Sequence, residues 1–163
     1  YLDKTKTFFT DKAPLNFKYI GFIKYIFPGA KIINCKRDSL DVSWSIFKNY
    51  FSGSLLFSND LKDIASFYNS YEELMSFWRD KFPGFIYDIK YENLVDDPKK
   101  EILKLLDYCG LDWDDNCLNH HKNTRSIKTA SSTQARKPIY KSAINSSKIF
   151  KEYLNSLIEN IKY

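Results

Sequence analysis

Arg37 and Ser45 are the residues of this sequence whose types and spacing first suggest phosphate binding. They lie eight residues apart, where a predicted strand gives way to a predicted helix. A guanidinium can hold a phosphate by a charged fork of hydrogen bonds, and a serine hydroxyl about two helical turns further on can add a neutral donor. Arg37 could instead form a salt bridge with Asp38 or Asp41, and the spacing alone leaves both interpretations open.

Two further side chains stand at the ends of predicted strands. Lys12 comes directly before Ala13 and Pro14, where a lysine facing the same crevice as Arg37 could stabilise negative charge on a bridging oxygen as a group leaves a phosphate. Tyr91 ends another strand, where it could stack on a purine or hydrogen-bond to it. The alternatives are an exposed surface lysine and a core tyrosine.

A long polar segment, residues 125–140, combines hydroxyls with positive charge. Its candidate ligands are Ser126, Thr129, Ser131, Ser132, Thr133, Arg136 and Lys137. Residues 120–151 hold eight Lys or Arg and no acid, which attracts anions. Backbone amides and hydroxyls can wrap an anionic ligand while flanking cations neutralise it. A loop of this length without secondary structure is uncommon unless it is functional or disordered, so we expect an anion-binding flap, with a flexible surface loop as the alternative.

Hydrophobic periodicity and turn residues predict the elements that must position these side chains. Strands are expected at residues 6–10, 31–35 and 85–91, and helices at 15–27, from 38 or 39 to about 51, 60–81, 98–109, 113–120 and 142–161. The helix at 60–81 could be broken near Asn69, and a short element is expected at 92–95.

Strands that alternate with helices imply parallel βαβ units and therefore an α/β fold, a parallel sheet flanked by helices. Ligands of such sheets bind outside the carboxyl ends of the strands. Lys12, Arg37 and Tyr91 all stand at such ends, so we expect them to lie near one crevice.

Composition indicates a single soluble domain over residues 1–163, because 44% of the residues are hydrophobic and 28% are charged. We find no apolar stretch of about 20 residues and no signal peptide, which favours a cytoplasmic protein with no membrane partner. The first residue is Tyr1 rather than Met, which suggests a trimmed segment. The three cysteines have no CxxC spacing, so we expect free thiols and no metal.

Four segments together resemble the sulfotransferase family that uses 3′-phosphoadenosine 5′-phosphosulfate, especially its bacterial and protein-tyrosine sulfotransferase members. In order, they are FFTDKAPLN, FPGAKIINCKRDSLDVSWS, IKYENLVDDPKKEILKLLDYCGLDWDDNCL and IKTASSTQARKPIY. No single segment is decisive, but four in the same order cover nearly the whole chain.

The resemblance implies a role for each candidate. Arg37 and Ser45 would bind the 3′-phosphate of the nucleotide, Tyr91 would contact its adenosine side, and Lys12 would stabilise the transition state. The basic segment would fold over the nucleotide, with Ser126 or Thr124 nearest the sulfate and Arg136 or Lys137 near the 3′-phosphate. Thr129 and Ser131 would be nucleotide ligands within that flap.

The resemblance also implies a P-loop-NTPase-like fold, from which this sequence departs. Family members begin with a strand and a Gly/Ser/Thr-rich loop that cradles the 5′-phosphosulfate at a helix N-terminus. None of the five glycines forms such a cluster, so we expect a truncated domain that lacks the first strand, the loop and an upstream catalytic carboxylate. Ser39 stands where the family usually has proline, and Asn49 where the tyrosine branch has a cation.

The implied reaction moves a sulfuryl group to an acceptor hydroxyl or amine, without a metal. The acceptor would be a glycan, a protein tyrosine or a small hydroxyl compound, selected by a variable segment near residues 50–69 that could equally belong to the core. Two alternatives remain. One is a kinase-like relative, which would need a glycine-rich loop and a magnesium carboxylate that the sequence does not supply. The other is a non-enzymatic polyanion-binding module built on residues 120–151, although few aromatics accompany its charges and we expect no nucleic-acid partner.

Overall fold

The computed structural model of the chain describes residues 7–51, 55–123 and 136–162. In chain order the elements are the 3-10 helix η1 (Pro14–Tyr19), helix α1 (Ile20–Ile26), strand β1 (Ile32–Lys36), helix α2 (Ser39–Phe47), the 3-10 helix η2 (Leu56–Asn59), helix α3 (Leu61–Lys81), strand β2 (Ile86–Lys90), helices α4 (Tyr91–Asp96) and α5 (Pro98–Cys109), the 3-10 helices η3 (Asp115–Lys122) and η4 (Lys148–Tyr153), and helix α7 (Asn155–Asn160).

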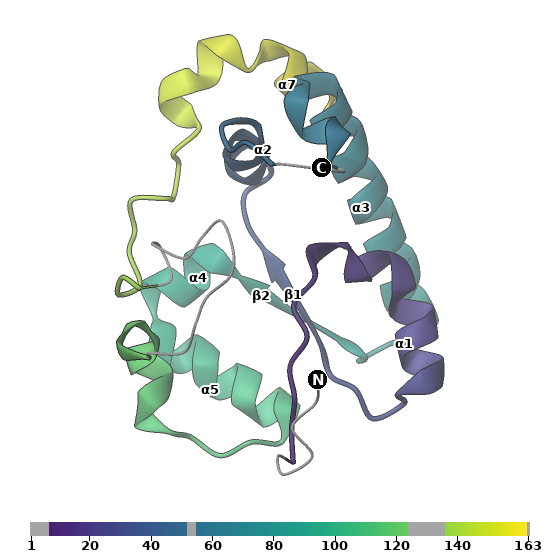
Figure 1. Cartoon of the computed structure of the whole chain (residues 1–163), viewed down its shortest axis with the longest axis vertical. Helices are drawn as coiled ribbons and strands as arrows, with labels where there is room; N and C mark the ends of the chain where they lie inside the picture. Colours follow the sequence, from purple (N-terminus) through teal and green to yellow (C-terminus); the bar gives the residue numbers. More distant parts are fainter. Residues whose placement is uncertain (1–6, 52–54, 124–135, 163) are drawn as a thin grey trace.

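The two strands form a parallel sheet in which Ile32 pairs with Ile86 and Lys36 pairs with Lys90. The connection between them runs through α2 and α3. Figure 1 shows α1 and α3 on one side of this sheet and α5 on the other, with α2 beyond the carboxyl end of β1. The predicted α/β class, a parallel sheet flanked by helices, is therefore confirmed.

The strand predicted at residues 6–10 is wrong for the described part of that segment. Residues 7–10 carry no strand pairing. Phe8 is 69% exposed and Phe9 is 63% exposed, so this segment gains no burial that would hold it against the edge of the sheet.

Helix α3 connects the two hydrophobic clusters of the molecule. Near its start, Ile64 and Ala65 pack against Leu154 and Leu157 of the C-terminal segment. Further along, Met75 packs against Ile20 and Phe85 in the second cluster. These buried positions recur at helical spacing, which is why one helix can serve both clusters.

The break considered near Asn69 is not observed, and α3 is continuous from Leu61 to Lys81. Asn69 donates to the carbonyl of Asn160 at 2.8 Å and accepts from the amide of Lys162 at 2.9 Å. Its polar side chain is therefore satisfied by the chain end and does not compete with the helical backbone.

Several other local predictions hold in part. The helix predicted at 15–27 forms as η1 followed by α1, and the helix predicted at 113–120 forms as the 3-10 helix η3. Asp97 caps α5 by accepting from the amide of Lys100, and Gly110 ends it with a φ of 68°. Helix α2 stops at Phe47 instead of continuing to 51.

Phe57 and Phe67 stack at 3.9 Å between ring centroids, which supports a core role for that part of the variable segment. Within the described residues, no helix has both the length and the apolar character needed to cross a membrane.

The single helix predicted at 142–161 is wrong. Residues 142–147 form turns, and η4 and α7 follow as separate short helices. Asn145 has a φ of 59°, which a continuing helix does not allow. The amides of Asn145 and Ser147 donate instead to the carboxylate of Asp41, 104 and 106 residues earlier in the chain. A tertiary contact therefore overrides the amphipathic pattern.

Gly21 offers a direct test of the packing between α1 and α3. A Cβ added there would lie 2.9 Å from Cη2 of Trp78, whose indole N–H donates to the carbonyl of Phe17 at 2.8 Å. Overpacking costs about 1–3 kcal/mol, against a helix-propensity gain of about 1 kcal/mol for alanine over glycine. We expect Gly21→Ala to lose about 1 kcal/mol of unfolding free energy in urea denaturation.

Gly29→Ala is the matched control, because a Cβ at Gly29 meets no atom within 4 Å. We expect it to change the unfolding free energy by less than about 0.5 kcal/mol. Equal effects at the two glycines would contradict the predicted clash with Trp78.

Candidate functional site

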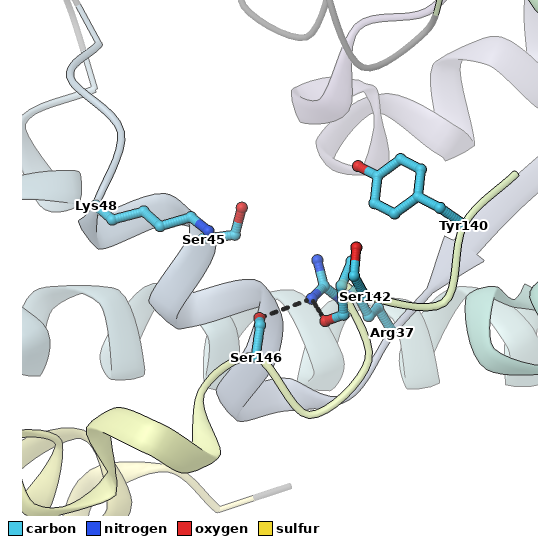
Figure 2. A pocket seen from close by; sticks show the side chains of 7 residues that line it. Arg37, Ser45, Lys48, Tyr140, Ser142 and Ser146 are labelled. Carbon is cyan, nitrogen blue, oxygen red and sulfur yellow. Dashed lines mark hydrogen bonds between the residues drawn. The ribbon is translucent and has the colours of Figure 1, made fainter. Parts of the chain in front are cut away.

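A polar cavity of about 240 Å³ lies beyond the carboxyl end of β1. It is lined by Arg37, Ser45, Lys48, Tyr140, Ser142, Ala143 and Ser146, as Figure 2 shows. One wall comes from the start and end of α2, and the other comes from the turns at residues 140–146. Among the residues that the structure describes, the lining combines two cations with four hydroxyls and includes no acid.

The local structure of α2 explains how one wall is built. Asp38 caps the helix by accepting from the amide of Asp41 at 2.9 Å, and Arg37 stands directly before this cap. Ser45 lies in the last turn, and Lys48 follows three residues later at the C-cap position. Residues three apart share one face of a helix, so Ser45 and Lys48 reach the same cavity.

Arg37 is held by residues 140–147, which we call the late segment. Its Nη2 donates to the carbonyl oxygen of Ala143 and to Oγ of Ser146, the latter at 3.3 Å. The guanidinium lies 5.4 Å from the centroid of the Tyr91 ring. Arg37 Nε is buried without a hydrogen-bond partner among the described residues. The side chain therefore has a defined orientation and at least one polar group that the described residues leave unsatisfied.

The sequence left open whether Arg37 forms an ion pair with Asp38 or with Asp41. In the structure, the partner is Asp41. The Nη2–Oδ2 distance is 3.6 Å. Asp38 serves instead as the helix cap, and its amide donates to Glu92 at 2.9 Å. The two interpretations of Arg37 are compatible, because it pairs with Asp41 on one side and lines the cavity on the other.

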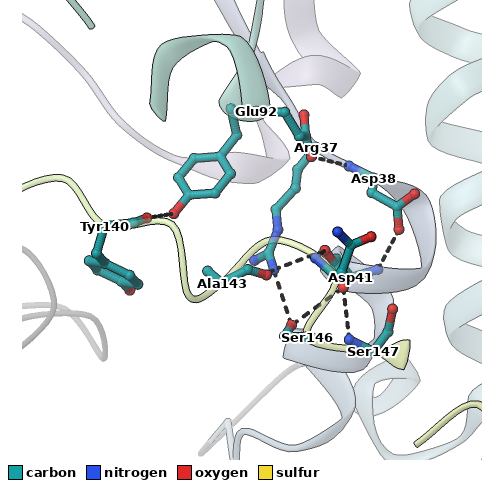
Figure 3. A network of polar contacts seen from close by, with 10 residues as sticks. Arg37, Asp38, Asp41, Glu92, Tyr140, Ala143, Ser146 and Ser147 are labelled. Atoms are coloured by element: carbon teal, nitrogen blue, oxygen red, sulfur yellow. Dashed lines mark hydrogen bonds and ion pairs between the residues drawn. The ribbon is translucent and has the colours of Figure 1, made fainter. Parts of the chain in front are cut away.

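Asp41 joins α2 to the late segment. Its side chain is 1% exposed and accepts from the amides of Asn145 at 2.7 Å and Ser147 at 2.8 Å, and from Oγ of Ser146 at 3.4 Å (Figure 3). Burial favours a higher pKa for this carboxyl, but the hydrogen bonds from Ser147 and Asn145 and the charge of Arg37 together lower the pKa below its ordinary value. Asp41 is therefore ionised at neutral pH.

Tyr91 lies beside this network. Its hydroxyl donates to the carbonyl of Tyr140 at 3.1 Å. Burial, followed by the neighbouring Tyr140, raises the pKa of Tyr91, so the phenol stays protonated and can keep this hydrogen bond. Tyr91 thus supports both Arg37 and the late segment, and it is not among the residues that line the cavity.

The structure brings together Arg37 and Ser45 but not every predicted site residue. Lys12 is exposed just before η1 and does not line the cavity. Arg136 and Lys137 are exposed on the segment that leads to Tyr140, also outside the lining, and the carbonyl of Lys137 lies 3.2 Å from Nε2 of His120. Ser126, Thr129, Ser131 and the alternative Thr124 lie outside the described residues.

Sequence reasoning missed Lys48, Tyr140, Ser142 and Ser146 as cavity residues. Lys48 could have been found, because it follows Ser45 at a spacing that shares a helix face. The two serines were hidden inside a predicted helix that does not form. Across the described ranges, no group of three or more His, Cys, Asp or Glu side chains is placed to hold a metal ion.

Comparison with known proteins gives a match to one protein family. The sequence profile of the sulfotransferase family matches residues 1–115, which include β1, α2 and β2. The chain belongs to the sulfotransferase family. The predicted resemblance is thereby confirmed at the level of the family.

A second match comes from a protein of Aquifex aeolicus (strain VF5) that is described only as an uncharacterized protein. It is 38% identical to this chain over 161 residues. The aligned region covers 97% of this chain and 21% of that protein, so the chain spans about a fifth of the length of the relative it matches.

Proposed function

We propose that this chain supplies the 3′-phosphate-binding and adenosine-binding part of an enzyme that transfers a sulfuryl group from 3′-phosphoadenosine 5′-phosphosulfate, within one domain that spans residues 1–163. The observation that carries the proposal is the shared cavity of Arg37 and Ser45, closed by a late segment and lined by no acid. Membership of the sulfotransferase family supports the same chemistry.

The cavity suits an anionic group that accepts several hydrogen bonds. Phosphate oxygens accept charge-assisted hydrogen bonds from a guanidinium, and serine hydroxyls add neutral donors. Asp41 lies behind Arg37, but its charge is offset by two backbone amides and a hydroxyl. Arg37 is thus held in position before an anion arrives, which lowers the entropy cost of binding, and it keeps part of its positive charge for that anion.

The proposed reaction is an in-line displacement at sulfur. An acceptor hydroxyl or amine attacks sulfur and passes its proton to a general base, the bond from sulfur to the 5′-phosphate oxygen breaks, and the nucleotide leaves with its 3′- and 5′-phosphates. Such reactions depend on positioning and on charge stabilisation. Arg37 and Ser45 act away from the sulfur, and the binding energy they provide orients the reacting end.

The remaining assignments belong to the same proposal. Lys12 stabilises the charge that develops on the bridging oxygen, and Tyr91 contacts the adenosine side. Ser126 or Thr124 lies nearest the sulfate, and Arg136 or Lys137 lies near the 3′-phosphate. Thr129 and Ser131 are further nucleotide ligands of the flap. The acceptor is a glycan, a protein tyrosine or a small hydroxyl compound.

The test compares two nucleotides by isothermal calorimetry. Adenosine 5′-phosphate lacks the 3′-phosphate of 3′-phosphoadenosine 5′-phosphate and is otherwise the same. Two charge-assisted hydrogen bonds are together worth about 3 kcal/mol, so we expect adenosine 5′-phosphate to bind about 100-fold more weakly.

Three outcomes would contradict the proposal. Equal affinity for the two nucleotides would show that the cavity does not hold a 3′-phosphate. Salt-sensitive binding of random polyanions without preference for the bisphosphate would favour a polyanion-binding module. Magnesium-dependent turnover of ATP would favour the kinase-like alternative.

A further inference from the structure

Lys48 gives the cavity a second positive charge. Its side chain points toward Ser45 in Figure 2, and both residues line the same space as Arg37. We propose that Lys48 is a specificity-determining ligand that makes the cavity select a terminal, doubly charged phosphate. This inference rests on the proposed function and adds a residue that the sequence pattern did not assign.

The charge balance of the cavity is the first argument. A phosphate monoester carries about −1.5 to −2 charges at neutral pH. Arg37 already shares its charge with Asp41, at 3.6 Å between Nη2 and Oδ2. A single guanidinium paired with a buried carboxylate leaves a doubly charged ligand short of compensation, and the ammonium of Lys48 supplies it.

The end of α2 provides a second argument. Ser45 lies in the last turn of this helix, where backbone carbonyls carry partial negative charge. An anion that binds the Ser45 hydroxyl is therefore repelled by the partial negative charge at the C-terminus of this helix. Lys48, at the C-cap position, places a cation where it offsets this field.

The surroundings of Lys48 form the third argument. Within the part of the chain that the structure describes, no carboxylate lies within ion-pair distance of its ammonium. Its neighbours in the cavity are hydroxyls and another cation. Two positive charges on one small cavity repel each other, and an anion bound between them compensates this repulsion. An anion with two charges resolves that repulsion better than an anion with one.

Lysine and arginine contribute differently here. The planar fork of Arg37 sets the direction of the hydrogen bonds, whereas an ammonium on a flexible stem acts as a point charge. Lys48 should therefore add to the affinity for charge without fixing the geometry of the ligand. Replacement by arginine should preserve most of this effect.

The experiment is a cycle of two ligands and three proteins. Calorimetry measures the affinity of the wild-type chain, Lys48→Met and Lys48→Arg for 3′-phosphoadenosine 5′-phosphate and for adenosine 5′-phosphate. We expect Lys48→Met to weaken binding of the bisphosphate about tenfold and binding of the monophosphate by less than about twofold. Lys48→Arg should stay within about threefold of the wild type for both nucleotides.

Lys100→Met is the control, because Lys100 is exposed on α5 and does not line the cavity. It should leave both affinities unchanged. If the wild-type chain does not prefer the bisphosphate, the proposed function itself fails. If that preference exists but Lys48→Met leaves it unchanged, or weakens both nucleotides equally, the inference about Lys48 is wrong while the proposed function stands.

Discussion

Replacing Arg37 with alanine should weaken binding of 3′-phosphoadenosine 5′-phosphate by about 100-fold or more. The change removes the charged fork from the cavity, and it also removes the donor to Ala143 and Ser146 that holds the opposite wall in place. Both the ligand contacts and the shape of the cavity are lost. Calorimetric titration of the variant measures the effect.

The conservative variant Arg37→Lys distinguishes a loss of ligand contacts from a loss of folding. Arg37→Lys retains a positive charge opposite Asp41, so the buried carboxylate keeps a counter-charge. A single ammonium cannot satisfy the late segment and a phosphate together, so we still expect a loss of about tenfold or more. Thermal unfolding of the same sample shows whether the variant is folded.

Arg79→Ala is the matched control for Arg37. Arg79 also forms an ion pair, with Asp88 at 2.9 Å, but it lies outside the cavity lining. This variant should lose some stability and keep the affinity of the wild type. If Arg37→Ala bound the bisphosphate as tightly as Arg79→Ala does, the assignment of Arg37 would be wrong.

The second large effect is expected on stability, at Asp41. Asp41→Asn keeps the shape of the side chain but removes the charge that pairs with Arg37. Its amide nitrogen cannot accept from the amides of Asn145 and Ser147, so one buried donor loses its partner. Removing one member of a buried, hydrogen-bonded ion pair costs about 3 kcal/mol or more of unfolding free energy. Urea denaturation at pH 7 measures this loss.

The pH dependence of that loss is a sharper check. The folded pKa of Asp41 is lower than its unfolded value, so the charged carboxylate stabilises the fold above the unfolded pKa of about 3.9. This contribution is lost as the pH falls through the folded pKa. The gap between wild type and Asp41→Asn should therefore be constant from about pH 5 to 8 and shrink below about pH 4.

Asp80→Asn serves as the control for Asp41, because Asp80 is exposed near the end of α3. It should change the unfolding free energy by less than about 0.5 kcal/mol. A loss at Asp41 as small as this, or a gap that does not shrink in acid, would show that the carboxylate does not hold the late segment. If the segment is held as described, Asp41→Asn should also weaken nucleotide binding, because residues 140–146 form one wall of the cavity.

The ends of several helices could be predicted because their signals are local. Asp60 and Asp97 cap α3 and α5 through their own neighbouring amides, and Gly110 adopts the positive φ that ends α5. The parallel pairing of β1 with β2 followed from the alternation of strands and helices. The helix ends need no distant part of the chain, whereas the strand pairing joins distant residues and was predictable only through the general rule for βαβ connections.

The sequence by itself determined that Arg37 and Ser45 could share one ligand, because a strand end and the following helix place residues eight apart in a predictable direction. Only the tertiary structure decided what completes the cavity. Asp41 accepts hydrogen bonds from backbone amides more than 100 residues further along the chain, so turns replace the predicted helix. These turns place Tyr140, Ser142 and Ser146 in the same cavity as Arg37. A periodic pattern cannot reveal this contact. It records which residues are apolar, and it does not identify the distant amides that donate to a buried carboxylate.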